Sequence, residues 1–336
     1  MTTTRTARTF HLTTRPSGFP APGLFSVVDA PLPAPGPGEA LVENLYLSVD
    51  PYHREEMDGG WELNTPLEGR AVGRVVASRD PALAEGDLVF HRHGWRTHAL
   101  VTAGTPGTRR LPSYEGVPLA AHLSILGGTG LTAYVALTRT LELRAGQDLF
   151  VSAAAGGVGT AVGRIARLLG AGRIVGSTGS PAKAARLTGE LGFDAAFDYH
   201  DGPFGELLAE AAPDGLDAVV DNVGGDQLEG AIGALREHGR IAWVGAIAQY
   251  HSAGRPPAAP RNLYDVVGKS LRLEGVLVRN HGDAQGELED LLVPHLRNGR
   301  ITPDVTVVDG FERTVDGFLA MLRGENTGKM LIRTGA

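Results

Sequence analysis

The chain of 336 residues contains no cysteine. This absence excludes disulfide bonds, thiolate nucleophiles and thiolate ligands for zinc. No apolar run reaches the roughly 18 residues that a membrane span needs, and the N-terminus lacks the apolar core of a signal peptide. The sequence therefore predicts a cytoplasmic location.

The chain also has fewer basic than acidic residues. Lys and Arg number 31 against 38 Asp and Glu, which gives a formal net charge of -7 at pH 7. This acidic balance argues against a binding surface for nucleic acid or for an anionic membrane. Apolar residues are plentiful, at 42% of a chain that is too long for one ordinary core, so we expect two domains.

The sequence pattern changes near residue 119. Up to about Ser113, short strand-like runs are broken by Pro and Gly, which is typical of a small, irregular β domain. From about Leu119 the pattern consists of helices and buried strands. A strand–helix–strand tail, Thr306–Val308, Val315–Leu322 and Met330–Arg333, is predicted to return to the first domain. The runs of the first domain are Glu39–Tyr46, Gly69–Ser78, Asp87–Phe90 and Thr97–Val101.

The most informative motif is the small-residue turn Ala153–Gly159. It follows the apolar run Asp148–Val151 and opens a helical pattern with one apolar face. Small residues let the backbone approach a pyrophosphate, and the free N–H groups and dipole of a helix N-terminus attract it. Such turns also serve packing alone, but further strand–helix alternations follow, as a dinucleotide fold requires. The residues expected to bind the dinucleotide are Ala155, Gly156, Gly157, Val158 and Gly159.

The next strand pattern indicates which dinucleotide binds. Arg173–Ser180 ends without Asp or Glu, whereas an NAD site places an acid there to hold the ribose 2′-hydroxyl. Lys183 follows in the first turn of a helix for which Ser180 is the predicted N-cap. A lone Lys is often only a solvated helix residue, but the missing acid favours NADPH over NADH.

The histidines give a weak metal signal. The stretch His91–His98 contains three histidines, but it lies between short strand patterns and has no set of carboxylate partners. We therefore predict surface or loop histidines there, and a satisfied core residue at His122. The sequence predicts no metal site.

Six segments in one order establish a resemblance to a known family. From about Glu39 to Arg333, the chain resembles the medium-chain dehydrogenase/reductase superfamily. Within it, the match is to the zinc-free group of prostaglandin reductases, plant double-bond reductases and 2-alkenal reductases. The segments are Leu47–Tyr52, Gly130–Tyr134, Val151–Gly156, Asp221–Gly225, Gly245–Ile247 with Tyr250, and Gly324–Lys329.

The resemblance implies an α/β fold with two domains. A GroES-like β domain would comprise residues 1–120 and 300–336, and a Rossmann-type doubly wound parallel sheet domain residues 121–299. The active site would lie in the cleft between them. Leu271–Leu277 has the apolar alternation of a strand, and at a sheet edge it needs a partner to avoid open-ended pairing. We therefore expect a homodimer through the second domain.

The resemblance also implies which residues bind NADPH. Lys183 and Tyr199 would contact the 2′-phosphate beside Ser180. Relatives carry Asn-Tyr-Lys where this chain has Asp198, Tyr199 and His200. The residues that would line the ribose and nicotinamide are Asn222, Gly245, Ala246, Ile247, the backbone of Val276, Leu277 and Val278, and Asn326.

Two further positions depart from relatives. Zinc-dependent relatives carry Gly-His-Glu where this chain has Arg70 in place of the histidine. With no cysteine either, the ligands of a zinc alcohol dehydrogenase are missing. In the zinc-free group, Met usually follows the tyrosine that corresponds to Tyr52, where this chain has His53. That change lies on the substrate side and leaves the choice of substrate open.

Without a metal, the chemistry must be one that the cofactor performs with little help, and reduction of an activated C=C bond fits. By family similarity, hydride goes to the β-carbon of an enone or enal. The nicotinamide ribose 2′-hydroxyl, oriented by Tyr250, then donates to the carbonyl oxygen. The α-carbon would take its proton from Tyr52 or from water, unless Tyr52 is only a wall residue. Tyr250 and Tyr52 are the candidate catalytic residues. A quinone reductase of the same fold and a non-catalytic NADPH-binding sensor are the competing interpretations.

Overall fold

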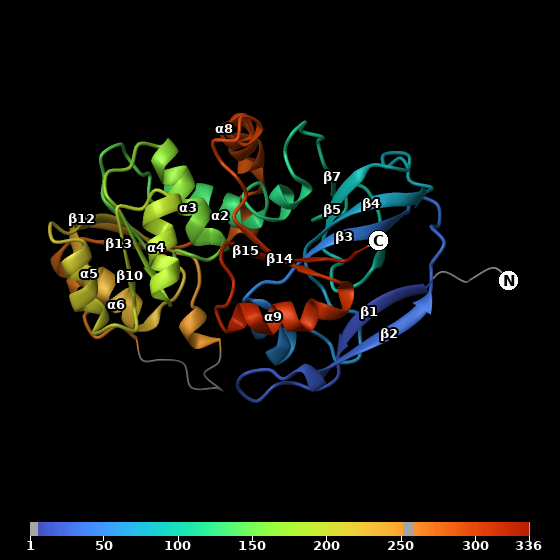
Figure 1. Ribbon diagram of the computed structural model, residues 1–336, viewed down its shortest axis with the longest axis horizontal. Helices are drawn as coiled ribbons and strands as arrows, with labels where there is room; N and C mark the ends of the chain where they lie inside the picture. The colour runs from blue at the N-terminus through green and yellow to red at the C-terminus, as the bar shows by residue number, and fades with distance from the viewer. Residues whose placement is uncertain (1–5, 251–258, 336) are drawn as a thin grey trace. The chain divides into compact units, whose positions relative to one another are not determined.

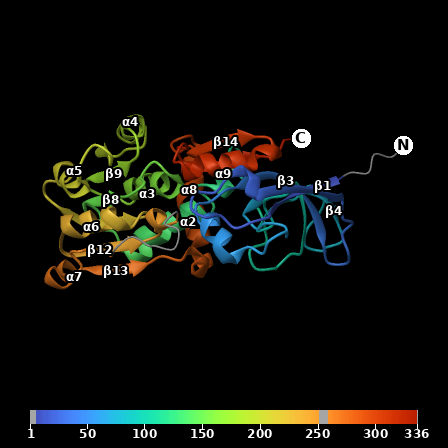
Figure 2. The same cartoon turned by 90° about the horizontal axis from the view of Figure 1, so that it is seen from below.

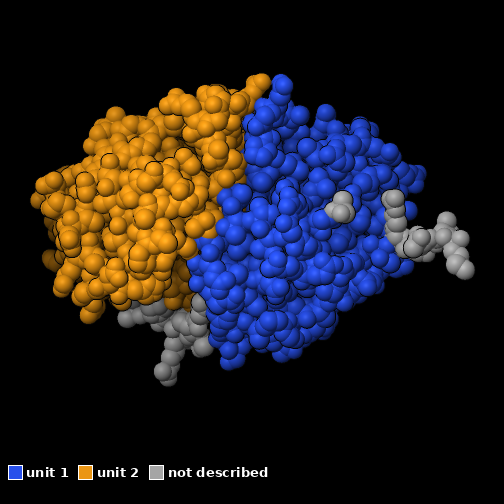
Figure 3. Space-filling model, viewed as in Figure 1, with its two compact units in different colours: residues 1–123, 305–326, 330–336 blue, residues 124–304, 327–329 orange. Residues whose placement is uncertain are grey.

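The computed structural model of the protein describes residues 6–250 and 259–335. The chain divides into two compact units, which Figure 3 colours separately. Unit 1 comprises residues 1–123, 305–326 and 330–336, and unit 2 comprises residues 124–304 and 327–329. Within the described ranges, no helix has both the length and the apolar character that crossing a bilayer requires.

Unit 1 is built on strands from distant parts of the sequence (Figures 1 and 2). In sheet order the strands are β14 (Val305–Asp309), β15 (Lys329–Arg333), β3 (Ala40–Ser48), β4 (Ala71–Ser78), β5 (Leu88–His91) and β7 (Arg109–Arg110), with β6 (His98–Val101) also on β3. β15 is antiparallel to β3, with Leu331 opposite Ser48, so segments far apart in the chain share one sheet. A separate hairpin of β1 (Thr6–Leu12) and β2 (Phe25–Pro31) was not predicted from the sequence.

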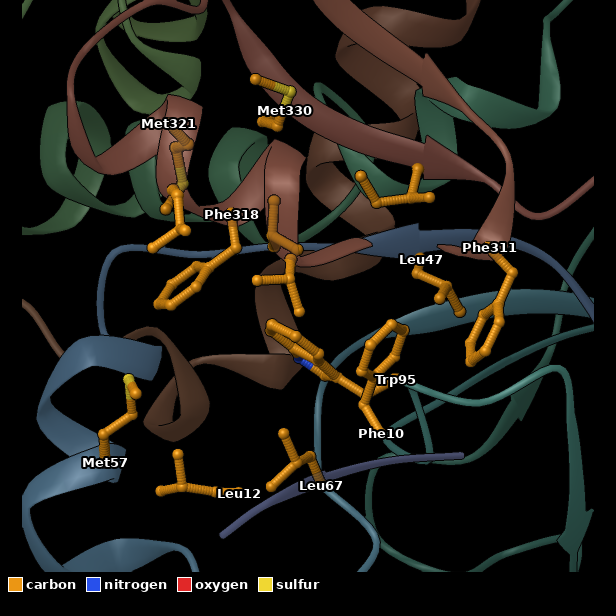
Figure 4. Packing of buried hydrophobic residues seen from close by; sticks show 14 of the residues in the cluster. Phe10, Leu12, Leu47, Met57, Leu67, Trp95, Phe311, Phe318, Met321 and Met330 are labelled. Carbon is orange, nitrogen blue, oxygen red and sulfur yellow. The ribbon is translucent and has the colours of Figure 1, made fainter. Parts of the chain in front are cut away.

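The core of unit 1 is rich in aromatic rings (Figure 4). Trp95 lies between β5 and β6, is fully buried, and stacks on Phe25 with 5.7 Å between ring centroids. Phe10 of β1 and Phe318 of α9 (Thr314–Leu322) meet the same indole edge to face. One buried indole therefore joins the N-terminal hairpin to the C-terminal helix.

His91 corrects one prediction from the sequence. We expected surface or loop histidines, but His91 ends β5 and is fully buried. Its Nδ1 accepts the backbone N–H of His93 at 3.1 Å, so the proton sits on Nε2, which donates to Oδ1 of Asn44 at 2.8 Å. Because both ring nitrogens have partners, the neutral ring is buried at little cost. Burial lowers the pKa of His91 to about 3.

Unit 2 contains a parallel sheet of six strands among the described residues. In sheet order they are β10 (Ala195–Asp198), β9 (Ile174–Thr178), β8 (Leu149–Val151), β11 (Leu216–Asp221), β12 (Leu235–Trp243) and β13 (Arg272–Gly275). β8 and β9 are buried at every residue, as in sheets covered on both faces. Numbered along the chain, the order is 3-2-1-4-5-6, which is that of a dinucleotide-binding Rossmann sheet. The predicted α/β class with a parallel sheet is confirmed.

The helices of unit 2 are α2 (Gly128–Val135), α3 (Gly157–Leu168), α4 (Pro181–Glu190), α5 (Phe204–Ala211), α6 (Gly225–Ala234), α7 (Tyr264–Gly268) and α8 (Gln285–Arg297). The helices α3 to α7 connect these strands, whereas α2 precedes the first strand and α8 follows the last. Leu208 of α5 and Ile232 of α6 pack with Phe150 and Val219 in one buried cluster, so these two helices cover one face of the sheet. α2 packs against α3.

Candidate active site

The order in which successive strands are added reverses its direction between β8 and β11, which is the topological switch point of the sheet. β9 and β10 continue the sheet on the β8 side, whereas β12 and β13 continue it on the β11 side. Ligands of open α/β sheets bind outside the carboxyl ends of the strands at such a point. Ser152 follows β8, and Asn222 follows β11. The candidate site is therefore built outward from these two residues.

The turn from β8 into α3 carries only small residues. Ala153 has a φ of +47°, a left-handed conformation that is uncommon for a residue other than glycine. Gly159 faces this turn, and a Cβ there would lie 2.5 Å from the Cα and carbonyl oxygen of Ala154. The first N–H groups of a helix have no partner within the helix and are free for a pyrophosphate. All the residues predicted to bind the pyrophosphate, Ala155, Gly156, Gly157, Val158 and Gly159, lie on this turn or on the first turn of α3.

A segment from near the C-terminus completes the turn. Gly328 donates its N–H to the carbonyl of Ala155 at 2.7 Å and forms an isolated bridge with Gly156. The backbone must approach closely here, because a Cβ on Gly157 would lie 3.3 Å from Lys329. Asn326, a predicted cofactor residue, precedes this contact by two positions and belongs to unit 1.

Asp304 anchors the same segment. Its backbone carbonyl accepts the N–H of Lys329 at 2.8 Å. Its buried carboxylate binds Arg164 of α3 at 3.2 Å and Arg186 of α4 at 3.0 Å. One carboxylate therefore links the helices that follow β8 and β9 to the segment that packs on the glycine turn.

The carboxyl ends of β8 and β11 are joined by a buried hydrogen-bond network. The Ser152 hydroxyl donates to Oδ1 of Asp221 at 2.6 Å and accepts the backbone N–H of Asn222 at 2.7 Å. The Asn222 side chain donates to the Ser152 carbonyl at 2.8 Å. Burial raises the pKa of Asp221, and the hydrogen bonds from Ser152, Gly224 and Val223 offset part of this rise. The network fixes the orientation of Asn222, a predicted ribose or nicotinamide contact.

The loop after β12 is tied to the same place. The N–H of Gly245 donates to the Asp221 carbonyl at 3.3 Å, and that of Ile247 donates to the Asn222 carbonyl at 3.3 Å. A Cβ on Gly245 would lie 3.6 Å from the Tyr250 hydroxyl and 3.3 Å from the Asn222 carbonyl. The structure therefore brings together Asn222, the turn Gly245–Ile247 and Tyr250, as expected from the sequence.

The last predicted contacts of unit 2 follow the edge strand β13. The N–H of Val276 donates to the Trp243 carbonyl at 2.9 Å and holds this segment beside the end of β12. Leu277 and Val278 come next, with the Leu277 side chain 48% exposed. They thus lie at the carboxyl edge of the sheet, where the other candidate residues lie.

The candidate 2′-phosphate site lies at the ends of β9 and β10. Ser180 caps α4, and its hydroxyl accepts the Lys183 N–H at 3.3 Å. Partial burial lowers the pKa of the Lys183 ammonium, because desolvation disfavours its charge. Tyr199 follows β10, with its hydroxyl 3.4 Å from the position that a Cβ on Gly179 would take. Burial, with Asp198, raises the pKa of Tyr199, which therefore stays protonated as a donor.

Tyr52 belongs to unit 1, where it precedes α1 (His53–Glu55). Its hydroxyl is buried and has no hydrogen-bond partner among the described residues. Burial raises the pKa of Tyr52, and the Arg70 guanidinium, 5.3 Å from the ring centre, offsets part of that shift. Arg70 is held by Asp50 at 3.4 Å, and Asp50 also accepts a bond from the Ser48 hydroxyl at 2.7 Å. Tyr52 is therefore a protonated hydroxyl whose hydrogen-bonding capacity is unused.

Known proteins share this sequence and fold. Residues 8–107 match the family described as the N-terminal domain of oxidoreductases, and residues 157–293 match the zinc-binding dehydrogenase family. The chain is 38% identical to prostaglandin reductase 1 of Mus musculus, over 94% of this chain and 95% of the relative. It is 32% identical to the NADPH-dependent curcumin reductase of Escherichia coli, over 97% and 96%. The crystal structure of CurA from Vibrio vulnificus in complex with NADPH matches with a TM-score of 0.90 at 29% identity, over 98% of this chain and 99% of that one.

The chain belongs to the zinc-independent group of the medium-chain dehydrogenase/reductase superfamily. The resemblance established from six sequence segments is thereby confirmed, and the protein is an oxidoreductase by family. A 2-alkenal reductase of Nicotiana tabacum, at 33% identity over 88% of both chains, belongs to the same set of relatives.

For this zinc-independent reductase, the resemblance implies that Arg70 stands where zinc-dependent relatives have a ligand histidine. The Arg70 guanidinium forms an ion pair with Asp50 at 3.4 Å. Across the described residues, His, Asp and Glu side chains form no group of three that could hold a metal ion.

Two parts of the reductase site were missed from the sequence. Asp221 stands beside the predicted Asn222, but only the fold shows that it bonds to Ser152 across the switch point. Asp304 gave no signal, because its partners Arg164 and Arg186 lie 140 and 118 residues away along the chain.

Proposed function

We propose that the protein catalyses NADPH-dependent reduction of the activated carbon–carbon double bond of α,β-unsaturated aldehydes or ketones. The observation that carries the NADPH part of this proposal is the acid-free end of β9 beside the glycine turn at the switch point. Relatives that share most of the chain are named prostaglandin reductase, 2-alkenal reductase and curcumin reductase, which supports the same substrate class.

The side chains of unit 2 fit NADPH. The turn Gly156–Gly159 offers close backbone approach to a pyrophosphate, and the first N–H groups of α3 have no partner within the helix. Lys183 and Tyr199 supply a cation and a hydroxyl for a 2′-phosphate. Asn222 and Tyr250 flank the Gly245 turn and suit the ribose and nicotinamide end.

The protein must stabilise charge on the substrate oxygen. When bound, reduced nicotinamide supplies a hydride to the β-carbon, so negative charge collects on the substrate's carbonyl oxygen. We assign its stabilisation to the Tyr250 hydroxyl near Gly245, which would orient a ribose hydroxyl of the bound cofactor as the donor. A preorganised donor aimed at developing charge is often the largest single contribution to such a reaction.

The second requirement is a proton for the α-carbon. Tyr52 suits this role because its hydroxyl stays protonated and has no competing partner among the described residues. Arg70, which lies over its ring, favours the tyrosinate that proton transfer would leave behind. Water is the alternative donor.

A substrate panel tests the proposal. NADPH oxidation is measured with an alkenal, an enone, the matching saturated aldehyde and a small quinone. We expect turnover of the first two and none of the saturated aldehyde. With NADPH deuterated at the transferred position, deuterium should appear at the β-carbon of the product. Turnover of the quinone alone would identify a quinone reductase, and no turnover at all would favour a sensor.

We also propose that the protein is a homodimer through unit 2. β13 is the outer strand of the six-stranded sheet, so among the described strands only β12 pairs with it. Near it, α7 exposes Tyr264 and Val267 at 80% and 69%. Twofold pairing of two copies would cover this edge and these side chains. The cytoplasmic location stays a prediction of the sequence.

A further inference from the structure

The end of β9 is faced by two rings. The N–H of Tyr199 donates to the Thr178 carbonyl at 3.0 Å, which holds the residues after β10 beside the end of β9. A Cβ on Gly179 would lie 3.3 Å from Cε1 of Tyr199 and 3.5 Å from Cε1 of His200. The two rings lie side by side, with centroids 4.1 Å apart. Both therefore border the glycine that stands where an NAD site carries its acid.

The His200 ring is oriented by a buried carboxylate. Nδ1 of His200 donates to Oδ1 of Asp198 at 2.8 Å, and the His200 backbone N–H donates to the same oxygen at 3.1 Å. The Asp198 side chain is 8% exposed and that of His200 is 60% exposed. Because Nδ1 keeps its proton for Asp198, the exposed Nε2 bears a proton only when the ring is a cation.

We propose that His200, oriented by Asp198, donates a hydrogen bond from Nε2 to the 2′-phosphate of NADPH, so that the preference for NADPH over NADH depends on proton uptake. The inference rests on the proposed cofactor and adds a residue to its site. A neutral imidazole would turn a lone pair toward the phosphate, whereas the imidazolium offers a charge-assisted donor. Binding of the phosphate therefore draws a proton onto the ring.

The candidate phosphate site contains other polar and charged groups. Asp198 accepts the Nδ1–H of His200, and Tyr199 remains a neutral donor. Lys183 in the first turn of α4 is a second basic group, and Asp201, in the turn after β10, is an exposed carboxylate. Of these groups only the imidazole ordinarily changes charge between pH 5 and 8.

The test measures dissociation constants for NADPH and NADH by calorimetry at pH 6.5, 7.5 and 8.5. The proteins are the wild type and the variants His200→Gln, His200→Lys and Asp198→Asn, with Asp201→Asn as a matched control. For the wild type, we expect the dissociation constant of NADH divided by that of NADPH to fall about tenfold as the pH rises. A tenfold change corresponds to the loss of about one charge-assisted contact. At every pH, His200→Gln should give the ratio that the wild type has at pH 8.5. His200→Lys should give the ratio that the wild type has at pH 6.5. Asp198→Asn should weaken the dependence, and Asp201→Asn should leave it as in the wild type.

Proton uptake gives a second readout that does not depend on turnover. At pH 7.5, the heat of NADPH binding in buffers of different ionisation enthalpy should reveal uptake of part of one proton. That uptake should be absent in His200→Gln and with NADH. The 2′-phosphate is mostly doubly ionised at this pH and contributes little. If His200→Gln keeps the wild-type ratio and proton uptake, the role of His200 is wrong. If the wild type prefers neither cofactor at any pH, the proposed cofactor fails instead.

Discussion

At the scale of single residues, burial decides which groups carry charge. Burial raises the pKa of Tyr52, and His91 stays neutral because it is buried with both ring nitrogens occupied. Asp221 is buried too, but three hydrogen bonds offset part of the cost of its charge. The properties of each residue therefore follow from its partners more than from its type.

Stability should fall in mild acid because of His91. Its pKa is about 3 in the folded protein and 6.5 as the ordinary value. Below pH 6.5 the unfolded chain binds this proton and the folded protein does not, so the free energy of unfolding falls by up to about 1.4 kcal/mol per pH unit. Urea denaturation at pH 7.5, 6.5 and 5.5 measures the slope. His91→Gln should flatten it below pH 6.5, and an unchanged slope would contradict the assignment.

Tyr250→Phe should lower kcat for an enone more than it weakens NADPH binding. An interaction that strengthens only in the transition state appears in kcat and kcat/KM together. Loss of a direct donor costs about 10²–10³-fold, and an indirect donor should cost less. Steady-state kinetics at saturating NADPH provide the measurement. If Tyr250→Phe keeps the wild-type kcat, Tyr250 only covers the cofactor and has no role in stabilising the enolate charge.

Tyr52→Phe separates two roles for its hydroxyl. If Tyr52 delivers the proton, kcat should fall and a solvent deuterium isotope effect should change. If Tyr52 only lines the substrate site, KM should change and kcat should not. The same enone and the same cofactor concentration as for Tyr250→Phe make the two variants comparable. We expect the loss in kcat, because the hydroxyl has no other partner among the described residues.

At the scale of elements, the turn into α3 has no room for a side chain at Gly159. Gly159→Ala places a Cβ 2.5 Å from the Ala154 backbone, so the turn must open. We expect a lower melting temperature and NADPH binding weakened about tenfold or more, since the phosphate loses aligned N–H groups.

Gly189→Ala is the matched control for Gly159→Ala. It also lies in a helix, near the end of α4, but a Cβ there would meet nothing within 4 Å. This change should stabilise the protein by up to about 1 kcal/mol through helix propensity and leave NADPH affinity unchanged. Thermal unfolding and calorimetry distinguish the two variants. Equal behaviour would mean that Gly159 is not needed for the turn.

The same elements show what the sequence could predict. β11 spans Leu216–Asp221 as expected, because the run is mostly apolar, as buried parallel strands are. β12 begins at Leu235, before the predicted Arg240, since polar residues occupy its first half. The β1–β2 hairpin was missed, because β2 is mostly exposed and its apolar residues Phe25, Val27 and Val28 do not alternate regularly with polar ones. Local patterns predicted the nucleotide turn, whereas contacts between distant residues, such as those of Asp304, require the fold.

At the scale of the whole molecule, activity should survive exhaustive chelation. The chain has no cysteine, and Arg70 occupies the place of a ligand histidine. Enone reduction is measured before and after dialysis against a strong chelator, with metal content determined in parallel. Stoichiometric zinc whose removal abolishes turnover would overturn this expectation.

Oligomeric state is the second property of the whole molecule. Light scattering at micromolar concentration should give twice the chain mass of 35.2 kDa. Val267→Glu places a charge on the exposed face of α7 and should shift the protein toward monomer, because burying an unpaired charge is costly. Val28→Glu, at a valine 41% exposed in unit 1, should leave the mass unchanged. A wild-type monomer would exclude the proposed dimer.

The contact between Gly156 and Gly328 limits how this enzyme can be recombined. A gene fragment for residues 124–304 encodes all six parallel strands but omits residues 327–329. The carbonyl groups of Ala155 and Asp304 would lose their N–H donors in such a fragment. Chimeras that exchange cofactor preference with a relative therefore need the short stretch around Gly328 from the same parent as the glycine turn. A single crossover after residue 304 would separate the two segments that meet in this contact.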